Sequence, residues 1–296
     1  MDNYIEKFIE YIRFERNYSN YTETNYLLDL EKYEEYLKQK HISYTKINYK
    51  QISLYTKYLK ETVKLNSSSI NRHLSTLRSF YNFLIHENII ATNPFKIVTG
   101  PKKAIKLPNF MKYNEFEIML ESCDDTILGI RNRALLELLL ATGARIGELI
   151  NLEVDDIDLV NDELKVLGKG NKERICYFGK PAKDALIKYL NESRNILLNG
   201  KNSNHLFINH IGGNLTDRGV RDIIDKIIKK SCLKVKVTPH TFRHTFATIL
   251  LNEGCDLKSV QELLGHVNLS TTSIYTHVTN DRIKDIYLHT HPRGKK

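Results

Sequence analysis

Residue types that could act on a phosphodiester gather in the last third of this chain. Within the segments TPHTFRHTFA, LLGHVNLS and SIYTH they are His240, Arg243, His266 and Tyr275. A tyrosine hydroxyl, with a pKa of about 10, is a weak nucleophile by itself. Fixed cations can neutralise the charge that develops on the non-bridging phosphate oxygens, and they then allow the hydroxyl to attack phosphorus. This part of the sequence therefore predicts a phosphoryl-transfer site.

Two earlier segments add cationic side chains that are ambiguous when taken alone. In ATGARIGEL, Arg145 follows a helix that is expected to end at Gly143, and small neighbours leave room for a large ligand. Glu148 could hold this guanidinium through a charge-assisted hydrogen bond, although a lone arginine is usually only solvated. In GKGNKER, Lys169 lies at the tip of a tight turn, where it could protonate a leaving oxygen or simply keep the turn soluble.

The HTFRH segment raises the alternative of a metal site. His240 and His244 are four residues apart on one helical turn, a spacing that suits a metal ion. No glutamate follows the first histidine as in HExxH, and no acidic third ligand lies nearby, so no metal is expected. His240 and Arg243 also share a helical face and could grip one phosphate together. We assign His244 to helix stabilisation or packing.

The elements that must position these groups form two parts of different character. The first hundred residues predict only helices: apolar side chains recur at helical spacing in three stripes, and a shorter helix is expected over about 48–62. Asn93-Pro94 is predicted to close the last helix, since proline disfavours a helical residue before it. Residues 99–108 then predict a linker. The stripes are Ile5, Phe8, Ile9 and Ile12; Tyr26, Leu30, Tyr33 and Leu37; and Ile70, Leu74, Leu77, Tyr81 and Leu84.

Beyond the linker the pattern is mixed, and the expected fold class is mainly α with a small β-sheet. An apolar helix is expected over 128–142 with Gly143 as its C-cap. The turn GKGNK (168–172) should join two strands as a hairpin. Asp256 and Ser270 are expected to be N-caps. The predicted strands are 154–159, 163–166 and 174–178, and the further helices are about 181–198, 216–230, 240–252, 256–264 and 270–277.

Length and composition fit this division and point to an anionic partner. The chain of 296 residues is long enough for two domains, each with its own core. Its formal net charge of +9 suits DNA or RNA, although charge alone decides little. The four cysteines are scattered without a CxxC pair, which favours free thiols in a reducing cytosol. No secretory signal and no apolar run near the roughly 20 residues that span a bilayer are found, so a cytoplasmic protein is expected.

Six residues, taken in their order along the chain, resemble the active-site signature of the tyrosine recombinase (phage integrase) family: Arg145, Lys169, His240, Arg243, His266 and Tyr275. The sequence motifs around these residues match as well, namely ATGxRxGEL, GKGNKER, HxxRHTFAT, LLGH and SIYTH. The resemblance covers about 109–296 and extends more loosely to the N-terminal helices, which resemble the family's SAM-like core-binding domain. The length and the HPRGKK end are most similar to the XerC/XerD type of site-specific recombinase.

The resemblance implies that the enzyme cuts and rejoins duplex DNA through a 3′-phosphotyrosine. Tyr275 would attack the scissile phosphate, His240 would assist proton transfer at Tyr275, and Lys169 would protonate the leaving 5′ oxygen. Because the phosphotyrosine conserves the bond, the chemistry would need no ATP, metal or other cofactor.

The remaining catalytic residues would bind the phosphate. Arg145 and Arg243 would clamp its non-bridging oxygens, since guanidinium forks match phosphate bidentately. His266 would donate one hydrogen bond to it, and Glu148 would orient the arginine cluster.

The resemblance also implies domains and partners. Residues 1–98 would form a helical core-DNA-binding domain and 109–296 the catalytic domain, which ends in an exchange tail (281–296). Both would bind a double-stranded core recombination site, and four subunits would form the synapse, with no part for a membrane. The expected role is resolution of chromosome or plasmid dimers, linked to chromosome partition and cell division. A second Xer-type recombinase and a septal DNA translocase are further partners of such a role. Candidate DNA contacts are Arg72, Arg78, Arg218 and Arg221.

Three other classes of function stay open on the sequence alone. A type IB topoisomerase shares the chemistry but relaxes supercoils by itself. A DNA-binding relative without activity would normally lack one of the six residues. A metal hydrolase would lose its activity when a chelator is added.

Overall fold

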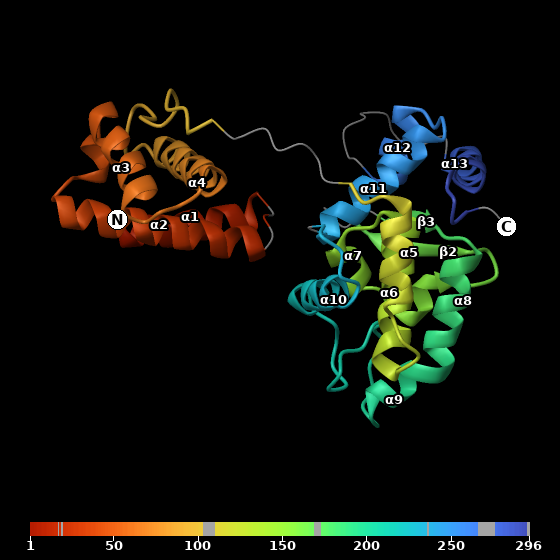
Figure 1. Ribbon diagram of the computed structural model, residues 1–296. Helices are drawn as coiled ribbons and strands as arrows, with labels where there is room; N and C mark the ends of the chain where they lie inside the picture. The colour runs from red at the N-terminus through yellow and green to blue at the C-terminus, as the bar shows by residue number, and fades with distance from the viewer. Residues whose placement is uncertain are drawn as a thin grey trace. The chain divides into compact units, whose positions relative to one another are not determined.

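The computed structural model describes residues 1–16, 18, 20–102, 110–168, 173–235, 237–265 and 276–294. The chain divides into two compact units, Met1–Lys106 and Leu107–Lys296 (Figure 1). The fold is mainly helical with a small antiparallel sheet in the second unit, as the sequence predicts. No helix in these ranges is long and apolar enough to cross a membrane.

The described part of the first unit is helical. The three predicted apolar stripes face its core, where nearly all of their side chains are buried. The predicted helix over 48–62 is present, and Asn48 caps it by accepting a hydrogen bond from the backbone N–H of Gln51. The helices are α1 (Asp2–Phe14), α2 (Asn20–Lys40), α3 (Tyr49–Glu61) and α4 (Ser67–His86), with a 3₁₀ turn at Tyr44–Lys46.

The end of α4 differs from the prediction. The helix stops at His86, well before Asn93-Pro94, because Asn88 takes a left-handed φ of 57° and so ends the helical path. Asn93 instead ties down the segment that follows: its side chain donates to the carbonyl of Arg78 (2.9 Å) and accepts from the N–H of Phe95 (2.9 Å). Asn93 therefore stabilises a local turn. In the sequence, an asparagine before a proline fits such a turn and a helix end equally well.

A buried polar network crosses the first core and joins α2, α3 and α4. The Tyr55 hydroxyl lies 2.5 Å from Nε2 of His73, and Nδ1 of His73 lies 2.9 Å from a carboxylate oxygen of Asp29. The other carboxylate oxygen accepts a hydrogen bond from the Thr76 hydroxyl at 2.9 Å. All four side chains are buried, so these contacts between polar groups favour one packing of the three helices.

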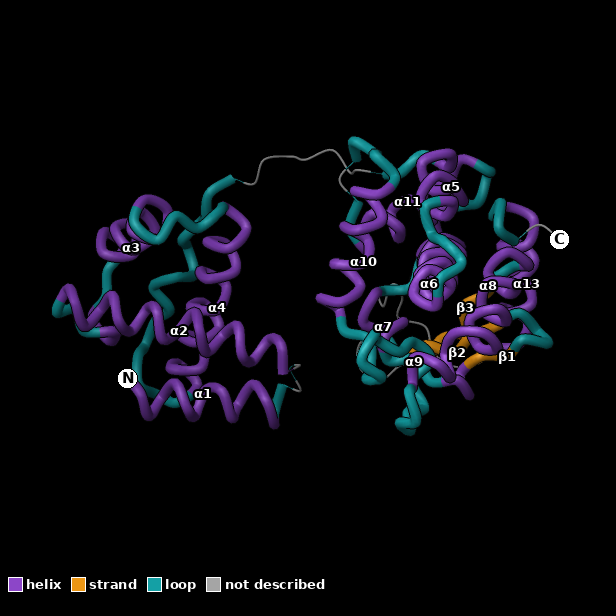
Figure 2. The backbone as a smooth tube through the Cα atoms, turned by 60° about the horizontal axis from the view of Figure 1, so that its bottom comes forward, coloured by secondary structure: helices purple, strands orange, loops and turns teal. Residues whose placement is uncertain are grey.

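Helix α6 (Ile127–Thr142) is the centre of the second unit (Figures 1 and 2). It is apolar around most of its circumference, which is expected of a helix covered on all sides. It contacts α8 (Lys180–Lys188), α11 (Pro239–Asn252), strand β3 (Glu173–Tyr177) and the π-helical segment Tyr189–Arg194. Helix α5 (Tyr113–Glu121) adds Phe116, Met119 and Leu120 to the same core.

The sheet has the order β1-β2-β3 with both pairs antiparallel. Strands β2 (Glu163–Leu167) and β3 pair in the register Lys165↔Ile175, so the two strands of the predicted hairpin are confirmed, while 169–172 of its turn lie outside the described residues. The predicted strand over 154–159 is wrong for its first half. Val154–Asp156 is a 3₁₀ turn, because Asp156 caps the N–H of Glu153, and only Ile157–Asp158 pair as β1.

The later helices follow the prediction. The helix expected over 181–198 is one continuous run, formed by α8, the π-helical segment and α9 (Asn195–Leu198). Helices α10 (Asp217–Lys230), α11 and α12 (Leu257–Leu263) come next, with Asp256 as the N-cap of α12. Ser270 and the first part of the helix expected over 270–277 lie outside the described residues, which resume with α13 (Thr276–Thr290).

Helix α13 packs against α11, α12 and β3 of its own unit. Tyr287 is fully buried there and lies against the rings of Phe246 and His291. Past the helix, Arg293 pairs with Glu117 of α5 at 2.6 Å. Tyr287, with Ile283 and Ile286 beside it, is thus covered in cis by the single chain, and exchange of the tail with a neighbour stays a prediction.

Candidate active site

The site begins at the end of α6, where a glycine is required. Gly143 caps the helix in the left-handed region (φ 57°), and a Cβ at this position would lie 2.6 Å from the ring of Phe246. The predicted C-cap is therefore confirmed. The chain turns sharply here and places Arg145 directly before the short helix α7 (Ile146–Ile150).

Glu148 of α7 accepts hydrogen bonds from two arginines. Its Oε1 accepts from Nη1 of Arg145 at 2.8 Å and from Nη1 of Arg174 at 2.8 Å. Its Oε2 accepts from the backbone N–H of Arg145 at 2.7 Å and from Nη2 of Arg174 at 2.8 Å. The Arg145 side chain is 42% exposed, whereas Arg174 and Glu148 are 14% and 5% exposed. Arg145 is thus the more exposed of the two guanidiniums, and the buried Glu148 holds it in place.

Arg243 reaches the same place from α11. Its Nη1 donates to the carbonyl of Gly143 at 2.8 Å, and its Nη2 donates to the carbonyl of Leu264 at 2.5 Å. These two bonds hold the end of α6 next to the end of α12. Leu264 and Gly265 directly precede His266 in the chain, so Arg243 also anchors the segment that leads to that residue.

The electrostatics of this cluster favour an anion. Burial opposes ionisation of Glu148, but hydrogen bonds from Arg174 and Arg145 outweigh it and lower the pKa of Glu148 to about 2. Burial and the neighbouring cations Arg145 and Arg174 lower the pKa of Arg243 to about 10, which still leaves it charged near neutral pH. Two guanidinium groups bond the Glu148 carboxylate and that of Arg243 lies near them, so this place holds three positive charges and one negative charge, and the surplus suits a phosphate. We call Arg145, Arg174, Arg243 and Glu148 the arginine cluster.

The structure brings together only some of the predicted catalytic residues. His240 lies on the first turn of α11, the helix that carries Arg243, and its side chain is exposed. Lys169, His266 and Tyr275 lie outside the described residues. The segments on either side of them are described: β2 and β3 flank Lys169, Gly265 precedes His266, and α13 follows Tyr275.

The metal alternative finds no support in the described residues. His244 is exposed like His240, and no three His, Cys, Asp or Glu side chains of these ranges lie close enough together to hold a metal ion.

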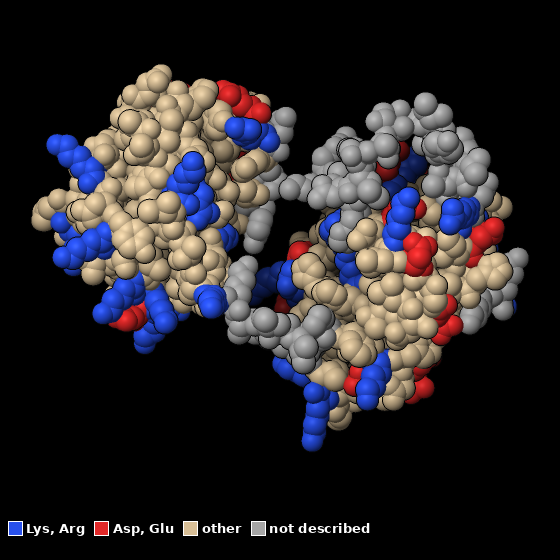
Figure 3. Space-filling view, turned by 90° about the horizontal axis from the view of Figure 1, so that it is seen from above, with Lys and Arg blue, Asp and Glu red and all other residues tan. Residues whose placement is uncertain are grey.

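The four candidate DNA contacts differ in how free their guanidinium groups are. Arg78 is half-buried and donates to the carbonyls of Phe95 (3.3 Å) and Val98 (3.0 Å), which is a structural task. Arg72 is largely exposed but pairs with Asp29 at 3.0 Å. Arg218 is exposed on α10, and Arg221 forms an ion pair with Asp217 on the same helix. In Figure 3, basic side chains are spread over the visible face of the first unit with few acidic ones, whereas the second unit shows both signs.

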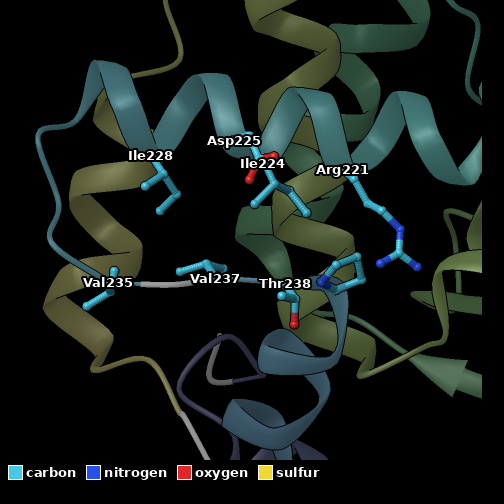
Figure 4. Close-up of a pocket in the computed structure, with 8 residues that line it drawn as sticks. Arg221, Ile224, Asp225, Ile228, Val235, Val237 and Thr238 are labelled. Atoms are coloured by element: carbon cyan, nitrogen blue, oxygen red, sulfur yellow. The ribbon is translucent and has the colours of Figure 1, made fainter. Parts of the chain in front are cut away.

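A pocket of about 380 Å³ lies between α10 and the segment that enters α11. Figure 4 shows Arg221 and Thr238 at one end of it and Ile228 with Val235 at the other. Its walls are mostly aliphatic, and none of the arginine cluster lines it. The arginine cluster therefore lies outside this pocket.

Arg174 is the member of the cluster that the sequence interpretation missed. It belongs to the GKGNKER motif, in which only Lys169 was assigned a function. The available signal was an arginine followed by the apolar pair Ile175 and Cys176 in a strand, since a charged residue drawn into a core needs a partner of opposite charge.

Two family models match the chain: the phage integrase family over residues 109–282, and the phage integrase N-terminal SAM-like domain over residues 5–88. The chain therefore belongs to the phage integrase family, the tyrosine recombinases, which are DNA strand-transferring enzymes.

Within this family the chain is similar to the proteins named tyrosine recombinase XerC. It is 45% identical over 291 residues to that of Anoxybacillus flavithermus, covering 97% of each chain. To that of Bacillus subtilis it is 42% identical over 300 residues, covering 99% of this chain and 98% of the relative. A solved structure of XerH site-specific recombinase bound to a palindromic difH substrate matches with a TM-score of 0.70 and 28% identity, over 91% of this chain and 80% of that one. The predicted family, enzyme class and link to DNA recombination are confirmed.

Proposed function

We propose that this chain cuts and rejoins duplex DNA at a core recombination site through a 3′-phosphotyrosine on Tyr275, and that it resolves chromosome or plasmid dimers. The observation that supports the chemistry best is the arginine cluster, because three neighbouring guanidiniums with a single carboxylate among them are suited to a phosphodiester and to its transition state.

The reaction needs only groups of the protein and of the DNA. The Tyr275 oxygen forms a bond to phosphorus, and its proton leaves with the help of His240. The bond from phosphorus to the 5′ oxygen breaks, and that oxygen takes a proton from Lys169. The 5′ hydroxyl of another strand then attacks the phosphotyrosine, which restores a phosphodiester and frees Tyr275. One ester replaces another at each stage, so the chemistry is proposed to need neither ATP nor a metal ion.

Three residues would stabilise the negative charge that develops on the non-bridging phosphate oxygens. Arg145 is the exposed guanidinium and would bind the non-bridging oxygens from the open side. Arg243 would bind them from within while it keeps its carbonyl bonds, and His266 would donate a further hydrogen bond.

The proposed partner is a double-stranded core site, in a synapse of four subunits. The net charge of +9 favours phosphate contacts, which would supply most of the affinity, with fewer base contacts for specificity. The XerH relative was solved on a difH substrate, which supports a dif-type site here. Such a role places the chain in the cytoplasm, with a second Xer-type recombinase and a septal DNA translocase as further partners. The N-terminal unit is proposed as the core-binding domain and the C-terminal unit as the catalytic domain.

A trapped covalent adduct tests this proposal. The purified chain is mixed with a dif-type duplex that carries a nick close to the cleavage point, so that the short 5′-hydroxyl fragment diffuses away after cleavage. We expect a protein–DNA adduct that survives denaturation, and we expect Tyr275→Phe to bind the DNA with nearly unchanged affinity but to form none.

The contrary outcomes are distinct. Adduct formation by Tyr275→Phe would reassign the nucleophile, and specific binding without any adduct by the unaltered chain would indicate a DNA-binding protein without activity. Strong inhibition by EDTA would revive the metal interpretation of His240 and His244.

A further inference from the structure

We infer that Arg174 is a positioning residue of the recombination reaction, which keeps the charge of Arg145 available for the scissile phosphate by neutralising and orienting Glu148. This inference rests on the proposed function, because it concerns the same phosphate site.

The geometry of the contact is that of a complete fork. Both terminal nitrogens of Arg174 donate to Glu148, one to each carboxylate oxygen, at 2.8 Å. Such a bidentate pair fixes the plane of the carboxylate as well as its position. Each of the two oxygens also accepts a hydrogen bond from Arg145, one from its side chain and one from its backbone N–H. The direction of the Arg145 guanidinium is therefore set by Arg174 through Glu148.

The charges support the same role. Glu148 next to Arg145 alone would form a closed ion pair, in which the carboxylate competes with any phosphate for the guanidinium. Arg174 supplies a second cation to the same carboxylate and leaves the pair of arginines with a surplus charge. Burial alone would lower the pKa of Arg174, but the hydrogen bond to Glu148 and the interactions with Glu148 and Cys176 together outweigh it and raise the pKa above its ordinary value. Arg174 therefore stays charged across the usual pH range.

Arg174 is placed to support the site and not to replace Arg145 as a phosphate ligand. Its side chain is only 14% exposed, and Glu148 occupies both of its terminal nitrogens. Its aliphatic part is also enclosed, because a Cβ at Gly265 would lie 2.7 Å from Cδ of Arg174. Because this fork is enclosed and already holds the buried Glu148, it is placed to orient that carboxylate.

Arg174 also connects segments that carry other proposed catalytic residues. It lies on β3, which follows the segment 169–172 with Lys169 in the chain, and its side chain lies next to Gly265, the residue before His266. An effect of Arg174 could therefore reach the reaction through Arg145 or through Lys169. The experiment must separate these routes.

The first measurement compares cleavage with binding. Single-turnover adduct formation on the nicked dif-type duplex is measured for the unaltered chain, Arg174→Met and Arg174→Lys, at protein concentrations that saturate the DNA. We expect Arg174→Met to cleave about 10- to 100-fold more slowly, the range found when a group that supports a ligand-binding residue is lost. Arg174→Lys keeps the charge without the fork and should lie between the two. The dissociation constant for DNA should change by less than about threefold in both variants, because Arg145 and the exposed cations remain.

The matched control is Arg194→Met. Arg194 is likewise half-buried in the same unit, and it donates to the carbonyls of Ser203 (2.7 Å) and His205 (2.6 Å), apart from the arginine cluster. We expect this variant to lower the melting temperature about as much as Arg174→Met and to cleave DNA at the rate of the unaltered chain. Equal loss of cleavage in both variants would show that Arg174 matters only for folding.

Two modified substrates separate the routes. A methylphosphonate at the scissile position removes one negative charge from the phosphate and reduces the need for cations. A 5′-bridging phosphorothiolate leaves as a thiolate of lower pKa and reduces the need for the acid Lys169. We expect the defect of Arg174→Met to shrink at least about tenfold on the methylphosphonate and to persist on the phosphorothiolate. The opposite pattern would overturn the inference and assign Arg174 to the lysine turn.

A double variant tests the link through Glu148. Because a neutral glutamine no longer competes for Arg145, Arg174→Met with Glu148→Gln should cleave no more slowly than Arg174→Met alone. A defect equal to the product of the two single defects would contradict the link. Absence of an adduct with the unaltered chain would refute the proposed function itself, whereas normal cleavage by Arg174→Met beside an active unaltered chain would refute only this inference.

Discussion

Two arginines that the sequence assigns to the same phosphate have different structural tasks. Arg145 is exposed and its partner Glu148 keeps Arg174 when Arg145 is removed, so its contribution to folding is small. Arg243 instead bonds two backbone carbonyls that lie at different helix ends. Its loss would leave both acceptors without their donor in a half-buried place.

This difference predicts a split between stability and activity. Arg145→Ala should lower the free energy of unfolding by about 1 kcal/mol or less, and Arg243→Ala by about 2–4 kcal/mol. Both should slow adduct formation on the order of 10²- to 10³-fold, the scale of a lost oxyanion donor. Urea unfolding and single-turnover cleavage measure the two quantities. Equal losses of stability would show that the carbonyl bonds of Arg243 contribute little.

At this scale the sequence anticipates contacts within a motif better than contacts between motifs. The bond between Arg145 and Glu148 spans three residues of one helical turn, so spacing alone suggests it. The partner of Arg174 lies 26 residues away along the chain, and the two partners of Arg243 lie 100 and 21 residues away. Local periodicity carries no information on which distant segment arrives at a given side chain.

Among the elements, the long apolar stripes and the paired strands β2 and β3 are predicted well, whereas the short segment Val154–Asp156 is not. Helices α1, α2 and α4 bury faces whose periodicity is plain in the sequence. Val154–Asp156 also looks like a strand by its apolar and acidic alternation, but a side-chain cap from Asp156 to the N–H of Glu153 closes a 3₁₀ turn there. A single local hydrogen bond of this kind outweighs the weak preference of two or three residues for a β-strand.

A pair of glycine substitutions tests how the tail is held against these elements. A Cβ at Gly179 would lie 1.7 Å from the carbonyl oxygen of Arg293, so Gly179→Ala must push the C-terminal turn away from the end of β3. We expect a loss of about 1–3 kcal/mol in the free energy of unfolding. Gly147→Ala is the matched control, because nothing lies within 4 Å of its Cβ and its helix favours alanine, so the protein should gain about 0.5–1 kcal/mol. A neutral Gly179→Ala would mean that the turn at Arg293 moves without loss.

At the scale of the whole molecule, the apolar face of the tail can be covered by its own chain or by a neighbouring subunit. In the single chain, Tyr287 is fully buried with Leu250 and Phe246 of α11 in one cluster. If subunits exchange tails in a synapse, each acceptor receives a neighbour's helix in place of its own. The buried area then stays the same, so exchange needs little free energy beyond the opening of the cis contact.

Mixing two damaged subunits distinguishes exchange from a permanent cis contact. Tyr287→Ala damages the tail but keeps the acceptor, and Leu250→Ala damages the acceptor but keeps the tail. With exchange, an intact tail from one variant can occupy the intact acceptor of the other. We therefore expect the mixture to bind a DNA with two half-sites more cooperatively, and to recombine faster, than either variant alone. Lys284→Ala removes partly exposed polar contacts to Glu163 and to the Asn161 carbonyl but leaves the buried Tyr287 in place, so it is the control and should behave like the unaltered chain. If the tail always stays in cis, every subunit in the mixture carries one damaged contact, and the mixture will perform no better than the average of the two variants.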